Sequence, residues 1–283
     1  MMSASAPTAP SALVFHDLTL GYDGHPAVHH LDGPVARGSL TAVVGANGSG
    51  KSTLLKGVVG ALRPLGGSVT RAPGLRTAYL PQLSELDRSF PATVADLVAL
   101  GHWPRRGLLG RHRREDREQA ARAMSAVGLE GFERRGIDTL SGGQLQRALF
   151  ARVLVQDADL VLLDEPFNAI DAATVRDLVG LIHRWHGEGR TVMVVAHDLD
   201  LVRENFPSSL LLARHPIAWG ETAETLRPEN LLRARRFDEA WDEGAEWCGH
   251  DAPHGHDDSG DGVGGNDAGK NGTGERATGR RAA

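Results

Sequence analysis

The chain contains the stretch Gly45-Ala46-Asn47-Gly48-Ser49-Gly50-Lys51-Ser52, which fits the pattern G-x-x-x-x-G-K-[ST]. In such a loop, backbone N–H groups surround the phosphates of a nucleotide, the lysine reaches the β and γ oxygens, and the last hydroxyl reaches a magnesium ion. The apolar segment 40–44 enters the loop as a buried strand, and segment 53–59 leaves it with apolar residues at helical spacing. A bound phosphate would therefore lie at a helix N-terminus, which favours anions.

Two further motifs lie downstream, at 140–144 (Leu-Ser-Gly-Gly-Gln) and 160–166 (Leu-Val-Leu-Leu-Asp-Glu-Pro). A Ser-Gly-Gly turn before a helix forms a second anion-binding nest, and an apolar strand that ends in two acids can hold a metal and activate a water. In this order and spacing, the three motifs resemble those of the ATP-binding cassette (ABC) ATPases, over about residues 13–235. The resemblance implies an α/β fold of the P-loop NTPase class, with a mainly parallel sheet, an antiparallel β part and an inserted helical subdomain.

The rest of the chain is organised around these motifs. Residues 13–81 are expected to form short strands, with turn signals at 23–24, 32–34 and 65–67. The helical subdomain is expected at about 83–139, after which helices and apolar strands alternate as in a parallel sheet. We expect four parts: a disordered leader at 1–12, the ATPase domain at 13–235, an extension at 236–247 and a disordered tail at 248–283.

ATP hydrolysis by such a site requires positioning, charge neutralisation and an oriented water. Ser52 and Asp164 are expected to hold Mg²⁺, Asp164 through water. Glu165 is the candidate general base, because it follows the metal-holding aspartate at the strand end. The residues expected to hold ATP in the loop are Gly45, Asn47, Gly48, Ser49, Gly50, Lys51, Ser52 and Thr53.

Three further residues take their roles from the resemblance. Gln82 occupies the position of a lid glutamine that contacts Mg²⁺ and senses the transport partner. His197 ends the apolar run 192–196, where the family has a histidine that touches the γ-phosphate. Tyr22 matches the aromatic residue that stacks on adenine, although packing in the core is the alternative. Together with Lys51 and Glu165, Gln82 and His197 form the expected catalytic group.

One phosphate loop and one distant anion nest in a single chain imply two chains per working unit. In the ABC ATPases, the signature turn of one subunit covers the γ-phosphate held by the other, in a head-to-tail dimer. The turn residues are Ser141, Gly142, Gly143 and Gln144. Asp171 fits the family's interface turn, whereas Asn168 stands where a serine is usual.

Several segments are similar to those of import ATPases. Segment 90–101 looks like the lobe that receives a short helix of a permease, and segments 164–171, 218–220 and 226–231 resemble the zinc and manganese importer ATPases. This resemblance implies ATP and Mg²⁺ as cofactors. The implied partners are a second copy, a polytopic permease and, indirectly, an extracytoplasmic substrate-binding protein. It also implies a cytoplasmic location, on the inner face of the cell membrane.

Three alternatives remain open at this stage. The ATPases of iron-siderophore, haem or cobalamin importers share the same lobe. Soluble cassette ATPases of translation or DNA maintenance generally carry two cassettes in one chain or a long coiled-coil insertion, and this sequence has neither. A phosphate-loop kinase would have no need of the Leu-Ser-Gly-Gly-Gln turn.

The composition of the chain limits the classes of function that remain possible. A chain of 283 residues with 41% hydrophobic content can bury one large core and a smaller lobe, and it has no run of eighteen apolar residues. The Pro-rich start lacks the basic and apolar regions of a secretion signal. The single cysteine fits a reducing cytosol, and the net charge of −5 gives no general attraction to nucleic acid.

The polar tail contains a second candidate site. Cys248, His250, His254 and His256 fall within nine residues of a segment rich in Gly, Asp and Asn. Thiolate and imidazoles are ligands that zinc prefers. The spacing matches no closed zinc site, so the alternatives are a metal-binding tail and a flexible polar tail that happens to contain histidines.

Overall fold

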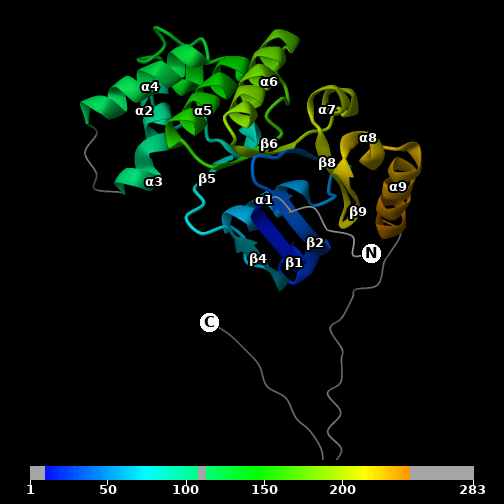
Figure 1. Cartoon of the computed structure of the whole chain (residues 1–283). Helices are drawn as coiled ribbons and strands as arrows, with labels where there is room; N and C mark the ends of the chain where they lie inside the picture. Colours follow the sequence, from blue (N-terminus) through cyan, green and yellow to red (C-terminus); the bar gives the residue numbers. More distant parts are fainter. Residues whose placement is uncertain (1–9, 108–112, 243–283) are drawn as a thin grey trace, which may run out of the picture. The chain divides into compact units, whose positions relative to one another are not determined.

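The computed structural model describes residues 10–107 and 113–242, all of which belong to the unit Met1–Ala245. Its strands form a three-stranded sheet of order β2-β1-β4 and a six-stranded sheet of order β5-β6-β7-β3-β8-β9 (Figure 1). The strands are β1 (Ser11–Tyr22), β2 (His25–Ala36), β3 (Leu40–Val44), β4 (Gly66–Arg71), β5 (Thr77–Leu80), β6 (Leu160–Asp164), β7 (Thr191–Val195), β8 (Ser208–Ala213) and β9 (His215–Glu221).

The larger sheet is parallel from β5 to β8, and only β9 runs antiparallel to its neighbour. The smaller sheet is antiparallel throughout. The described helices are α1 (Lys51–Val59), α2 (Val94–Ala99), α3 (Trp103–Arg106), α4 (Arg114–Ala126), α5 (Gly142–Gln156), α6 (Ala172–Gly187), α7 (Leu199–Asn205), α8 (Thr222–Thr225) and α9 (Pro228–Asp242). Short 3₁₀ turns lie at Leu83–Glu85, Leu100–His102 and Ile137–Thr139. This arrangement confirms the expected fold class.

The central strands are buried because both faces of the sheet are covered. In β3, Leu40, Ala42 and Val44 join a core that includes Phe150 of α5, whereas Val43 faces a second core with β1, β2 and α1. Strands β6 and β7 alternate between the same two cores, as the two-residue period of a strand requires. Since β3, β6 and β7 are parallel, the loops that follow them meet at one edge of the sheet.

The helical subdomain packs around α5. Figure 1 shows α2, α4 and α5 side by side, and both shorter helices contact α5. Helix α5 begins at Gly142 because Ser141 caps it, so the signature turn joins the subdomain to the sheet core. In the described residues, no helix is both long enough and apolar enough to span a membrane.

The structure corrects several expected boundaries. Strand β1 begins at Ser11 with Ala12 fully buried, so it includes two residues of the expected leader. Helix α9 passes through position 235, where the ATPase domain was expected to end. Strands β1 and β2 have twelve residues each, longer than the short strands expected.

The turn expected at 32–34 is also wrong, because these residues lie within β2. A Cβ on Gly33 would approach the ring of Trp219 to 2.9 Å, which explains the glycine. Pro34 is tolerated since β2 is an edge strand, where a missing N–H need not pair.

Candidate nucleotide site

The phosphate loop adopts a backbone that glycine permits. Gly48 and Gly50 have φ of 81° and 93°, in the left-handed region. A Cβ at Gly50 would lie 2.3 Å from the carbonyl oxygen of Ala27, and one at Gly45 would lie 2.0 Å from that of Leu212. The motif glycines therefore let neighbouring backbone pack directly against the loop.

Lys51 begins α1 and is 5% exposed. Its Nζ donates hydrogen bonds to the carbonyl oxygens of Gly45 at 3.0 Å and Ala46 at 2.6 Å, so the ammonium lies within the curve of the loop. Beside it lies a cavity of about 420 Å³, a size typical of small-molecule sites. The cavity is lined by Ala27, Asn47, Gly48, Gly50, Lys51, Ser52, Thr53, Gln82 and Glu165.

Ser52 and Gln82 line this cavity, and Asp164 of β6 contacts Ser52 beside it. The Ser52 hydroxyl donates to Asp164 Oδ1 at 3.0 Å, and Gln82 Nε2 donates to Ser52 Oγ at 3.0 Å. Asp164 is fully buried, and this burial raises the pKa of its carboxyl. A cation would compensate a buried carboxylate, and hydroxyl, amide and carboxylate oxygens are the ligands that Mg²⁺ accepts. The residues present therefore fit a magnesium ion.

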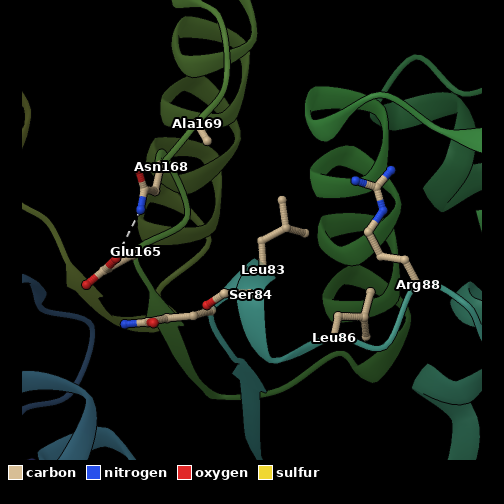
Figure 2. A pocket seen from close by; sticks show the side chains of 8 residues that line it. Leu83, Ser84, Leu86, Arg88, Glu165, Asn168 and Ala169 are labelled. Atoms are coloured by element: carbon tan, nitrogen blue, oxygen red, sulfur yellow. Dashed lines mark hydrogen bonds between the residues drawn. The ribbon is translucent and has the colours of Figure 1, made fainter. Parts of the chain in front are cut away.

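Glu165 and His197 follow β6 and β7, and the parallel sheet brings them together. His197 Nε2 and Glu165 Oε1 are 2.6 Å apart in a hydrogen bond. On the other carboxylate oxygen, Asn168 Nδ2 donates to Oε2 at 3.3 Å (Figure 2). Glu165 has φ of 49°, which bends the chain directly after the strand. The candidate base thus lines the nucleotide cavity with both of its oxygens held.

The signature turn does not line that cavity. Ser141 Oγ accepts a hydrogen bond from the Gln144 N–H at 3.2 Å, and Gln144 Oε1 accepts one from the Ser141 N–H at 3.1 Å, which forms a capping box. Asp171 caps α6 through the N–H groups of Ala173 and Thr174. Each motif has a local structural role in one subunit, and their contact with nucleotide across an interface stays a prediction.

Comparison with known proteins decides the family. A family model described as "ABC transporter" matches residues 28–168. The chain is 41% identical to the zinc transport system ATP-binding protein TroB of Treponema pallidum over 230 residues, which are 79% of this chain and 86% of that one. This chain belongs to the ABC transporter family. It is an ATPase subunit, as the resemblance implied.

Other relatives agree with this assignment. The manganese transport system ATP-binding protein MntB of Listeria monocytogenes is 40% identical over 220 residues, 76% of this ABC ATPase and 92% of that protein. A solved ABC transporter assigned to the metal-chelate type, in an inward-facing conformation, has a TM-score of 0.73 and 29% identity. That match covers 80% of this chain and 90% of the solved one.

Two residues near the site were not singled out as functional from the sequence. Tyr79 of β5 donates its hydroxyl to Asp164 Oδ2 at 3.3 Å, and Asn168 donates to Glu165. Tyr79 lies between buried Ala78 and Leu80, so the two-residue period of a strand places it on the opposite face. That alternation is a signal that could have found Tyr79.

Two further expectations concern Tyr22 and the polar tail. Tyr22 is 47% exposed at the end of β1, so it does not pack in the core, and its stacking on adenine stays a prediction. Cys248, His250, His254 and His256 lie outside the described residues. Among the residues that the structure does describe, no group of three or more His, Cys, Asp or Glu side chains could hold a metal ion.

Proposed function

We propose that this ABC ATPase powers the import of zinc or manganese. The observation that carries the proposal is the set of relatives at about 40% identity, named as zinc and manganese transport proteins, which the chain matches over 86% to 92% of their length. The transporter assigned to the metal-chelate type is less similar, at 29% identity. Import of a chelated metal therefore has weaker support than import of a free metal ion.

The geometry supports a division of labour at the nucleotide. Lys51 and the loop N–H groups would hold the β- and γ-phosphates of ATP. Ser52, Asp164 and Gln82 would hold Mg²⁺, which neutralises charge on the phosphates during transfer. Glu165 would accept a proton from the attacking water, and His197 would hold the glutamate and contact the γ-phosphate.

The ATPase would act as a head-to-tail dimer. Its signature turn lies outside the nucleotide cavity of its own subunit and carries an N-terminal helix end, which suits an anion supplied by another copy. The dimer would dock on a polytopic permease at the inner face of the membrane, and a substrate-binding protein would deliver the metal from the other side.

The dimer can be tested by mixing two inactive variants. Lys51→Ala removes the loop cation, and Ser141→Arg disrupts the signature turn. A heterodimer of the two would hold one intact composite site, so the mixture should hydrolyse ATP faster than either variant alone. If heterodimers form and no activity returns, action across the interface is wrong.

The membrane partner can be tested by co-purification. The tagged full chain should retain a polytopic permease from a detergent extract of its host membranes. Retention of ribosomes or DNA in place of a permease would instead favour the soluble cassette alternative.

A further inference from the structure

We propose that Asn168 is a positioning residue that fixes the carboxylate of Glu165 for water activation; this rests on the proposed role of Glu165 as general base. Asn168 Nδ2 donates to Glu165 Oε2 at 3.3 Å, while His197 Nε2 shares a hydrogen bond with Oε1 at 2.6 Å. Each carboxylate oxygen is thus anchored by a different segment of the chain. Two anchors fix the plane of the carboxylate, which a single one would leave free to rotate.

The anchors leave room for the reacting water. An ionised carboxylate accepts about four hydrogen bonds in all, so each oxygen of Glu165 retains capacity after one bond. General-base catalysis depends on geometry first, because the base must lie within hydrogen-bond reach of the proton that it removes. A carboxylate held in one plane therefore offers its free lone pairs in a constant direction.

Asn168 contacts Glu165 from outside the nucleotide cavity. Glu165 lines the nucleotide cavity, whereas Asn168 does not. Asn168 instead lines two neighbouring cavities, of about 360 and 210 Å³, and Glu165 borders both of them. Figure 2 shows the amide of Asn168 turned toward Glu165. Within one subunit, its contact with the reaction therefore passes through the glutamate.

The local backbone explains how the amide reaches its target. Glu165 and Ala169 both have left-handed backbone, with φ of 49° and 57°, and the Asn168 N–H donates to the Glu165 carbonyl oxygen at 3.2 Å. This tight turn brings a side chain three residues later back over the glutamate. A serine at 168 would present its hydroxyl one atom nearer the backbone, and an aspartate of the same shape would have no N–H to donate.

The test compares Asn168→Asp, Asn168→Ala and Asn168→Ser with the wild type, using the full-length chain and MgATP. Loss of a hydrogen bond to a charged group predicts that kcat falls about 10- to 100-fold, while the KM for MgATP changes less than about twofold. Asn168→Ser should resemble Asn168→Ala, because its hydroxyl falls short. If the variants keep wild-type kcat, exceed it, or lose activity only through KM, the positioning role is overturned.

A double-mutant cycle separates this role from a structural one. In the Glu165→Ala background, Asn168→Ala should cause no further loss of the residual single-turnover hydrolysis, because its target is absent. In the Glu165→Gln background, the same change should leave ATP-driven dimerisation intact. Additive losses, or a lost dimer, would overturn the proposal. If Glu165→Ala hydrolysed ATP as fast as the wild type, the assignment of Glu165 as the general base would instead be refuted.

Discussion

The two ends of α1 offer a matched test of how the phosphate loop is built. Gly50 caps its N-terminus with φ of 93°, and Gly60 caps its C-terminus with φ of 81°. Alanine at either site should cost about 1–2 kcal/mol for left-handed backbone. The two sites differ in their surroundings. A Cβ at Gly50 would lie 2.3 Å from the Ala27 carbonyl oxygen, whereas at Gly60 the nearest atom is Arg71 Nη2 at 3.5 Å.

This difference sets the expected magnitudes. Gly60→Ala should lower the free energy of unfolding by about 1–2 kcal/mol, the backbone cost alone. Gly50→Ala should add an overpacking cost of about 1–3 kcal/mol, since a backbone oxygen cannot swing aside. The expected total for Gly50→Ala is therefore about 2–5 kcal/mol.

Urea unfolding of the two variants measures these losses, provided that the m-value stays constant. ATP affinity under native conditions gives a second measurement, because Gly50 lines the nucleotide cavity and Gly60 does not. Gly50→Ala should weaken ATP binding, and Gly60→Ala should leave it near the wild-type value. Equal losses of stability, or normal ATP affinity in Gly50→Ala, would refute this account of the loop.

Four further predictions follow from the site and its surroundings. Glu165→Gln should retain ATP but lose about 10²- to 10⁴-fold in phosphate release, and near-normal turnover would remove Glu165 as the base. Tyr79→Phe deletes the hydroxyl that bonds Asp164 and should raise the Mg²⁺ concentration for half-maximal hydrolysis about tenfold; an unchanged Mg²⁺ dependence would contradict the contact. Buried Asp116 bonds a neighbouring arginine, which lowers the pKa of its carboxyl from 3.8 to about 2. Since the folded pKa of Asp116 is depressed, the stabilisation that it provides is present above about pH 4 and is lost as pH falls toward 2. Asp116→Asn should therefore reduce the pH dependence of the melting temperature between about pH 4 and pH 2. If the histidine-rich tail binds zinc, the full chain should bind it more tightly than a chain ending at Trp247, and less well below about pH 6.5; equal binding would assign the tail no metal site.

The motifs could be predicted from sequence because they depend on neighbours in the chain. The apolar run 40–44 forms β3 within the predicted limits, and Ser141 caps α5 through a capping box that is typical of such sequences. The parallel order of strands also follows from alternating helices and strands. It accounts for the meeting of Glu165 and His197 at one edge of the sheet.

The remaining features depend on contacts between distant segments. The sequence around Gly33 predicted a turn, but the residue is a glycine because the ring of Trp219, far along the chain, leaves no room for a side chain. The bond from Asn168 to Glu165 depends on two left-handed residues whose conformation no local pattern indicates. Non-local packing thus determined the features that sequence reasoning missed.

Transport by the assembled complex tests the central claim most directly. The ATPase, its permease and its substrate-binding protein would be reconstituted in vesicles, with radioactive zinc, manganese or an iron chelate on the side of the binding protein. We predict ATP-dependent accumulation of Zn²⁺ or Mn²⁺ that Lys51→Ala abolishes. Uptake of an iron-siderophore, haem or cobalamin, with no uptake of either free metal, would contradict the account.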